Sequence, residues 1–213
     1  MANTLLVTRP FYDPTTSYLH YWNLNIIDTA KRKSMKVIDL DSKRANKKEL
    51  TSVIEKVRPS LVLLNGHGND NMILGQDGEI LIKVGENEYI LNNCLIYALS
   101  CKSAKVLGPS SIKAGAKAYI GYVEDFIFFV ENDYSTRPQS DPIAGLFLKP
   151  TNIIVESLIK GHAAGKAEEN GRREFNKNIQ SVLSSKSSEG YLARFLIWDM
   201  IHQVCLGDHN STI

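Results

Sequence analysis

Cysteine is scarce in this chain, whose 213 residues contain only Cys94, Cys101 and Cys205. No two of these cysteines form a CxxC pair and the five histidines are scattered, so we expect no structural zinc site, no catalytic metal and no other cofactor. An odd number of cysteines also argues against a disulfide framework. The N-terminus has no basic region followed by an apolar run and a small-residue cleavage site, so we expect a cytoplasmic protein.

Charge of one sign and long hydrophobic runs are lacking as well. A formal net charge of +2 excludes a nucleic-acid binder that relies on bulk charge. The apolar runs at 61–65 and 126–130 are far shorter than the roughly 18 to 20 residues that a membrane span needs. We therefore expect neither nucleic acid nor membrane as a partner, and the length fits one domain rather than two.

Short apolar segments alternate with longer amphipathic ones, which is typical of parallel strands joined by crossover helices. The sequence predicts an α/β fold in three layers: a mainly parallel sheet of about six strands with helices on both faces. The predicted strands are 4–9, 35–41, 61–65, 94–100 and 118–122, with 126–130 as a sixth strand or an apolar lid. The first predicted helices are 15–33, 46–57 and about 104–116.

The remaining segments fit around this core within a single domain, 1–213. The core covers 1–130, and residues 71–91 are short apolar pieces separated by turn formers, which predicts a small β insertion. Residues 131–142 are polar and rich in turn formers, so we expect an exposed linker there. A C-terminal helical part, 143–213, follows, with helices near 150–160, 163–185 and 189–204.

Two reactive residue types follow consecutive predicted strands. His67 comes two residues after 61–65, and Cys101 directly after 94–100. Ligands of open parallel sheets bind at the carboxyl ends of the strands, and adjacent strands are roughly 5 Å apart. If these two strands are neighbours, the sequence predicts a Cys-His catalytic dyad at that edge of the sheet.

The residues around the pair suit acyl transfer. Gly68 lacks a Cβ, so its N–H can approach a substrate carbonyl and form an oxyanion hole with the Cys101 N–H. We also expect Cys101 to lie at the start of a helix and beside the Lys102 ammonium. Both features would lower the thiol pKa and favour a thiolate, with His67 as general base and then acid.

The segments LVLLNGHGN and LIYALSCKSAKVLGPSSIKAGAKAYIGY resemble the paired signatures of the caspase, legumain and gingipain superfamily (clan CD) of cysteine peptidases. They are most similar to gingipain-like and CHAT-domain proteins, in which Gly-Ala and Ile-Gly follow the cysteine strand. The late segments 158–167 and 205–208 are also similar to gingipain-like proteins. His209 departs from the proline that commonly follows Leu-Gly-Asp, and the 71–91 insertion is longer than in minimal members.

This resemblance implies a caspase-like fold and a cysteine endopeptidase that hydrolyses peptide bonds through a thioester intermediate. His67 and Cys101 match its catalytic positions, and Gly68 matches its oxyanion position. It also implies a pocket for the P1 side chain, which precedes the cleaved bond. Acids in that pocket would favour Arg or Lys at P1, and Arg137 in the linker would suit self-cleavage. The residues matching the pocket are Asp13, Tyr122, Glu124 and Asp125.

Other interpretations of the same residues stay open. The chain can be a catalytically silent caspase-like interaction or signalling module, a different Cys-His acyl hydrolase such as an amidase, or a flavodoxin-like fold with an incidental thiol. Asp13 can be a turn former, and Glu124 and Asp125 can be solvated loop acids. Besides a protein or peptide substrate, a regulatory protein or a second copy of the chain stays open as a partner, because the apolar segment 191–201 suits either the core or an interface.

Overall fold

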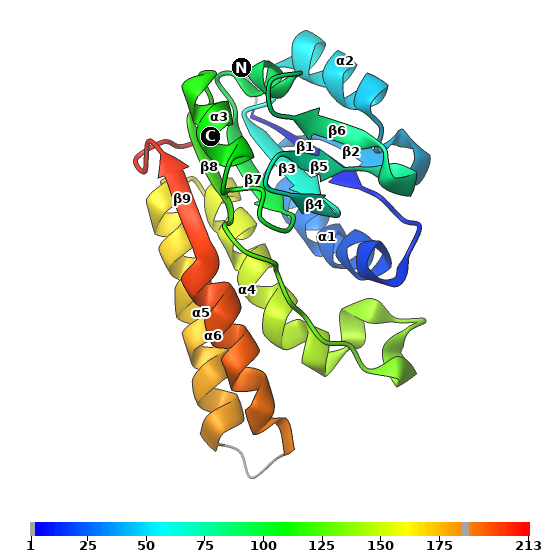
Figure 1. The fold of residues 1–213 in the computed structure, drawn as a ribbon, viewed down its shortest axis with the longest axis vertical. Helices are drawn as coiled ribbons and strands as arrows, with labels where there is room; N and C mark the ends of the chain where they lie inside the picture. Colours follow the sequence, from blue (N-terminus) through cyan, green and yellow to red (C-terminus); the bar gives the residue numbers. More distant parts are fainter. Residues whose placement is uncertain (1–2, 185–187) are drawn as a thin grey trace.

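A six-stranded sheet forms the centre of the computed structural model, which describes residues 3–184 and 188–213. The sheet has the strand order β2-β1-β3-β7-β8-β9 (Figure 1). All its neighbouring strands pair in parallel except β8 and β9, which are antiparallel. The strands are β1 (Thr4–Arg9), β2 (Lys36–Asp41), β3 (Leu61–Asn65), β7 (Leu95–Leu99), β8 (Ala118–Tyr122) and β9 (Gln203–Gly207).

Helices cover both faces of this sheet and confirm the predicted α/β fold in three layers. On one face lie α1, α4 and the start of α5, and on the other lie α2, α3 and the β insertion. Helices α5 and α6 lie side by side and extend beyond the sheet (Figure 1). The α-helices are α1 (Pro14–Arg32), α2 (Lys47–Val57), α3 (Leu107–Lys113), α4 (Pro142–Ile159), α5 (Ala164–Ser184) and α6 (Ala193–His202).

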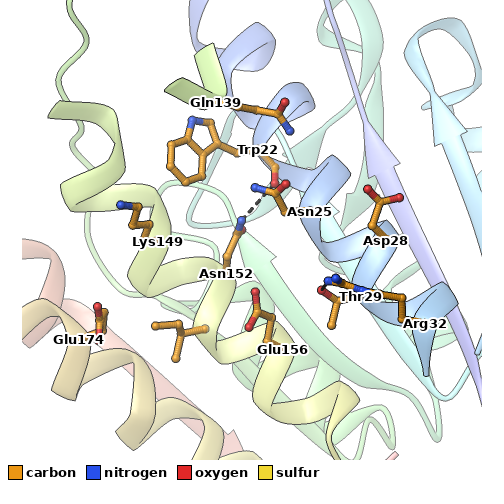
Figure 2. Close-up of a pocket in the computed structure, with 11 residues that line it drawn as sticks. Trp22, Asn25, Asp28, Thr29, Arg32, Gln139, Lys149, Asn152, Glu156 and Glu174 are labelled. Carbon is orange, nitrogen blue, oxygen red and sulfur yellow. Dashed lines mark hydrogen bonds between the residues drawn. The ribbon is translucent and has the colours of Figure 1, made fainter. Parts of the chain in front are cut away.

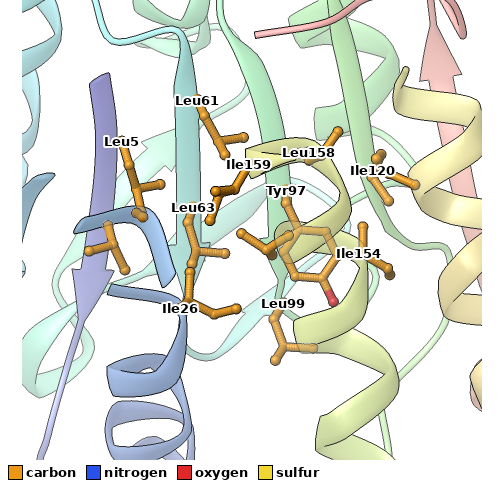
Figure 3. Packing of buried hydrophobic residues seen from close by; sticks show 14 of the residues in the cluster. Leu5, Ile26, Leu61, Leu63, Tyr97, Leu99, Ile120, Ile154, Leu158 and Ile159 are labelled. Carbon is orange, nitrogen blue, oxygen red and sulfur yellow. The ribbon is translucent and has the colours of Figure 1, made fainter. Parts of the chain in front are cut away.

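The largest part of the core lies between the sheet and α1 and α4 (Figure 3). Strand residues alternate between the two faces, so Leu63 and Tyr97 point to this layer while their neighbours in sequence point to the other. They meet Ile26 from α1 and Ile154 from α4. Each such side chain contributes about 1.5 to 3 kcal/mol on burial. The alternation therefore fixes the register of both strand ends that carry the candidate site.

Capping residues determine where the helices beside the sheet begin. Asp13 accepts a hydrogen bond from the Thr16 N–H, the Asp13 N–H donates to the Thr16 hydroxyl, and Pro14 fills the first helical position of α1. Asp141 caps α4 in the same way, accepting from the N–H groups of Ile143 and Ala144. Both caps are acids at the positive end of a helix.

The insertion forms a small antiparallel sheet of three strands beside the main sheet. Its strands are β4 (Gly68–Asn69), β5 (Met72–Leu74) and β6 (Ile80–Lys83), followed by the turn η3 (Glu88–Leu91). Ile73 and Leu81 bury their side chains against α2 and β3. The β character predicted for 71–91 is thus correct, although the first strand already begins at Gly68.

Of the two alternatives for 126–130, the sixth strand is wrong. These residues have no strand partner in the sheet, and β9 takes the sixth position instead. Phe126 and Phe128 turn toward the core rather than pairing through their backbone. The predicted final helix 189–204 divides accordingly into the turn η6 (Ser188–Leu192), α6 and the first residues of β9.

Three further boundaries differ from the sequence prediction. The helix after Cys101 begins only at Leu107, because residues 101–106 form turns. Within the expected linker 131–142 are the turns η4 (Asn132–Tyr134) and η5 (Pro138–Ser140), and Asp141 is buried. The helix expected from 150 starts eight residues earlier, at Pro142, with Pro150 inside it. Ser185, the end of the helix predicted at 163–185, lies outside the described residues.

One described helix, α4, is long and apolar enough by length and composition to cross a membrane. Its apolar surface is used within the protein, since 67% of that stretch is buried. Phe147 and Leu148, for example, have no exposed surface. A mostly buried helix of this kind is what the core of a soluble protein also contains, so α4 belongs to the core layer described above.

Candidate active site

The carboxyl ends of β3 and β7 bring the two predicted catalytic residues to the same edge of the sheet. The strands are neighbours and pair residue by residue up to Asn65 and Leu99. His67 and Cys101 each follow two residues after this last pair. The Gly66 N–H continues the contact by donating to the Leu99 carbonyl at 3.4 Å. Both residues therefore lie in loops at the same edge of the sheet.

Gly68 packs directly against the cysteine loop. A Cβ added at Gly68 would lie 2.1 Å from Ser100 Oγ and 2.7 Å from the Met72 carbonyl oxygen. Both distances are far inside van der Waals contact, so only glycine fits between the insertion and the residue that precedes Cys101. This packing is against the protein itself, and the close approach to a substrate carbonyl that the sequence predicted for this glycine stays a prediction.

His67 forms a short hydrogen bond with Asp13, at the start of α1. The distance from His67 Nε2 to Asp13 Oδ2 is 2.6 Å, and the carboxylate accepts the ring proton. This fixes the tautomer with the proton on Nε2 and leaves Nδ1 as the ring nitrogen that can take a proton from a thiol. Burial opposes ionisation of Asp13, but hydrogen bonds from the Thr16 N–H and from His67 hold the pKa of Asp13 below its usual value.

The loop that carries Asp13 is itself held by the insertion. The side-chain amide of Gln76 accepts from the Phe11 N–H at 2.8 Å and donates to the Phe11 carbonyl at 3.1 Å. Gln76 is in turn fixed through its own N–H, which donates to the Ala45 carbonyl at 2.8 Å. The insertion thus positions the Asp13 loop, and through it the imidazole of His67.

Cys101 is partly buried, and its thiol bonds to a carbonyl rather than to the imidazole. Sγ lies 3.9 Å from the Phe126 carbonyl oxygen, and the Asp125 carboxyl group also interacts with the thiol. Phe126 belongs to residues 123–131, which follow β8 and which we call the covering segment. Among the described residues, no hydrogen bond joins the Cys101 thiol to the His67 ring, which bonds to Asp13 instead.

The expectation of a lowered thiol pKa is wrong for this arrangement. Burial raises the pKa of Cys101, a backbone contact with Phe126 partly opposes this, and the carboxyl groups of Asp125 and Asp199 add to the rise. The helix expected behind the thiol starts six residues later, at Leu107. The Lys102 ammonium is 2.9 Å from Asp125 Oδ2, so its charge is already paired.

Two backbone N–H groups are suited to bind an oxyanion. Within the ranges 3–184 and 188–213, the Cys101 N–H has no acceptor. Because the Leu74 N–H donates to the His67 carbonyl, the alternation of an antiparallel ladder directs the Gly68 N–H away from β5. Both groups belong to the loops that carry the dyad, as the sequence analysis expected.

The residues predicted to bind the P1 side chain are not grouped as free acids. Asp13 is bonded to His67, and Glu124 lies 3.4 Å from the Lys105 ammonium. Asp125 pairs with Lys102. Tyr122 is 1% exposed and its ring lies 4.8 Å from that of Phe126. Each acid has a partner of its own, which removes the electrostatic argument for Arg or Lys at P1.

The other two cysteines are poor nucleophiles. Burial raises the pKa of Cys94 to about 11 and that of Cys205 to about 12. Cys94 is 2% exposed and Cys205 packs against the core. In the part of the chain that the structure describes, no group of three or more His, Cys, Asp or Glu side chains could hold a metal ion.

A polar groove of about 480 Å³ lies elsewhere, between α1 and α4 (Figure 2). Asp28 and Arg32 from α1 face Asn152 and Glu156 from α4 across it. Its acids and bases are mixed, and none of its lining residues belongs to the strand-end loops described above. The groove therefore adds no group to the candidate active site.

Comparison of the sequence with protein-family models and with curated proteins finds no match.

Three residues near the site were missed from the sequence: Gln76, and Trp198 and Asp199, which form hydrogen bonds with the backbone of the covering segment. Gln76 gives no local signal, because its role depends on where the insertion folds. Asp199 gives a signal, since it is the only acid in the apolar run from Tyr191 to Ile201. It is fully buried, and burial raises its pKa well above the usual value. An acid inside an apolar helix face indicates a buried polar contact.

Proposed function

We propose that this protein is a cysteine endopeptidase of the caspase and gingipain type. One observation carries the proposal: His67 and Cys101 follow paired strands in register, with His67 oriented by Asp13. A nucleophile, a base and a group that orients the base are the three parts that activate a thiol for acyl transfer. The resemblance of the segments around them favours peptide bonds as the substrate, and a cytoplasmic location is part of the same proposal.

The proposed reaction proceeds through a thioester. Nδ1 of His67 takes the thiol proton as Sγ of Cys101 attacks the peptide carbonyl carbon. The N–H groups of Gly68 and Cys101 stabilise the oxyanion. The C–N bond then breaks, and His67 returns the proton to the leaving amine. Water, deprotonated by His67, hydrolyses the thioester and regenerates the thiol.

A second function is favoured by a specific observation. The Cys101 thiol bonds to Phe126 rather than to His67, and its pKa is raised. A chain held permanently in this state would be a caspase-like interaction or signalling module without catalysis. The two functions differ in whether a substrate can displace the covering segment.

Covalent labelling tests this choice. The chain is incubated with peptidyl acyloxymethyl ketones that carry Arg, Lys, Asp, Leu or Phe at P1, and the adduct mass is measured. The peptidase predicts an adduct that Cys101→Ala abolishes and that Cys205→Ala, which removes another partly exposed thiol, leaves unchanged. Absence of an adduct with every probe, with and without calcium, would favour the interaction module.

A further inference from the structure

The covering segment is attached to the cysteine loop along its first residues. The Lys102 N–H donates to the Glu124 carbonyl at 3.1 Å, and just before the segment the Ala104 N–H donates at 3.0 Å to the carbonyl of Tyr122, the last residue of β8. The Phe126 carbonyl then accepts from the Cys101 thiol. The segment therefore lies where a peptide would have to approach the nucleophile.

Helix α6 holds the outer side of the same segment through three contacts. The indole N–H of Trp198 donates to the Asp125 carbonyl at 2.9 Å, and Asp199 accepts from the Ile127 N–H at 3.0 Å. The His202 carbonyl accepts from the Val123 N–H at 3.0 Å. These are single hydrogen bonds rather than a strand ladder, so the segment is attached without being part of the sheet.

Next to the thiol, the side chain of Phe126 occupies an aromatic environment. Its ring lies 4.8 Å from that of Tyr122 and 6.1 Å from that of Phe128. Phe128 in turn contacts Tyr18 of α1 at 6.0 Å. Tyr122 is buried at the end of β8, directly behind the cysteine loop. Aromatic side chains therefore surround the Phe126 ring, while the Asp125 carboxyl group that interacts with the Cys101 thiol is paired with Lys102.

The carbonyl that faces Sγ and the side chain in this aromatic site belong to the same residue. That is also the relation between the carbonyl carbon attacked in a substrate and its P1 side chain. The nearby acids Glu124 and Asp125 are each paired with a lysine, so a basic P1 side chain would gain little there.

We infer that the substrates are peptides with a large apolar or aromatic P1 side chain, and that Phe126 occupies the P1 site in this structure. This inference rests on the peptidase function proposed above. A substrate binds by displacing Phe126 and the covering segment, and its own P1 side chain takes the aromatic contacts with Tyr122 and Phe128. Phe126 is thus a competitor for the site as well as an indication of its specificity.

The test compares the labelling rates of Cys101 by probes that differ only at P1. The thiolate displaces the acyloxy group of each probe as a carboxylate and forms a thioether. Each modified molecule therefore gains the mass of one probe without its acyloxy group. We expect Phe and Leu probes to react at least about tenfold faster than Arg, Lys or Asp probes, from burial of the P1 side chain. Faster labelling by the Arg or Lys probe would overturn the inference and leave the peptidase standing, whereas no labelling at all would overturn both.

Two variants test the part played by the covering segment. Phe126→Ala removes the competing side chain, and Trp198→Phe keeps the ring packing but removes the hydrogen bond to Asp125. Both are expected to speed labelling by the Phe probe several-fold. The matched control is Val130→Ala, an exposed position on the same segment, which should not change the rate. Circular dichroism confirms that each variant is folded.

Alkylation by iodoacetamide provides a second readout that needs no P1 recognition. We expect both variants to raise the alkylation rate of Cys101 at neutral pH, because the thiol becomes more exposed and the burial that raises its pKa decreases. Unchanged alkylation and unchanged probe labelling in folded Phe126→Ala would show that the segment does not compete for the site, and would overturn the assignment of Phe126 to the P1 position.

Discussion

The two loops that form the candidate site are stabilised in opposite ways. The His67 loop is preorganised, because Asp13 orients the imidazole and Gln76 holds the loop that carries Asp13. The Cys101 loop is covered, since its thiol bonds to Phe126 and its pKa is raised by burial. In the peptidase that we propose, the base is thus already oriented while the nucleophile is covered, so a substrate would have to expose Cys101 before it reacts.

The largest effect is expected from Asp13→Asn. Asparagine is an equally good helix cap, so α1 should keep its start. The Asn amide would donate toward His67 Nε2, however, and force the ring proton onto Nδ1, where it cannot accept from the thiol. We expect kcat to fall about 100-fold. Steady-state kinetics on a peptide substrate measure this loss, and an unchanged kcat would separate Asp13 from catalysis.

Gly68→Ala tests the contact between the His67 loop and the Cys101 loop. The added methyl would clash with Ser100 Oγ and the Met72 carbonyl. Overpacking of this kind costs about 1 to 3 kcal/mol, and labelling of Cys101 should slow with it. Urea unfolding measures the stability. The control is Gly145→Ala in α4, where the nearest atoms are at 3.5 Å and the methyl should be tolerated.

Asp199→Asn tests how the buried carboxyl group that binds the covering segment affects stability at different pH values. The pKa of Asp199 is raised in the folded protein because the carboxyl is buried. The unfolded chain therefore loses this proton at lower pH than the folded chain, and its contribution to stability, full below about pH 4, declines as pH rises toward the folded pKa. We expect the variant to have a larger free energy of unfolding than the wild type at pH 8. At pH 4 the difference between the two should be smaller.

Urea unfolding at pH 4 and at pH 8 checks this expectation, with Asp133→Asn at an exposed position as control. A stability difference that does not change with pH would contradict the raised pKa of Asp199.

The smallest effect is expected from Gln76→Ala, which weakens the attachment of the loop that carries Asp13. It removes two partly exposed hydrogen bonds with the Phe11 backbone, worth about 1 kcal/mol in total. Labelling of Cys101 should slow several-fold because Asp13 is less well placed. Gln139→Ala, which removes one amide contact with the Tyr21 carbonyl, should cost similar stability without changing the labelling rate.

Local sequence signals were enough for most of the sheet. The strands 4–9, 61–65 and 118–122 were predicted with the bounds that the structure has, because buried parallel strands are continuous apolar runs. The segment 126–130 carries the same signal, yet β9 takes the edge position instead. An apolar run indicates burial, but it does not determine whether the backbone finds a strand partner.

In the candidate site, too, the sequence determined some features and the tertiary structure decided others. The sequence by itself determined the placement of His67, Gly68 and Cys101, because their distance from the ends of two buried strands is fixed by chain length and periodicity. Only the tertiary structure decided the partners of these residues: Asp13 binds His67, lysines neutralise Glu124 and Asp125, and Phe126 covers the thiol. These contacts join residues far apart in the chain, and the order of the strands and the path of the C-terminal helices determine which of them meet.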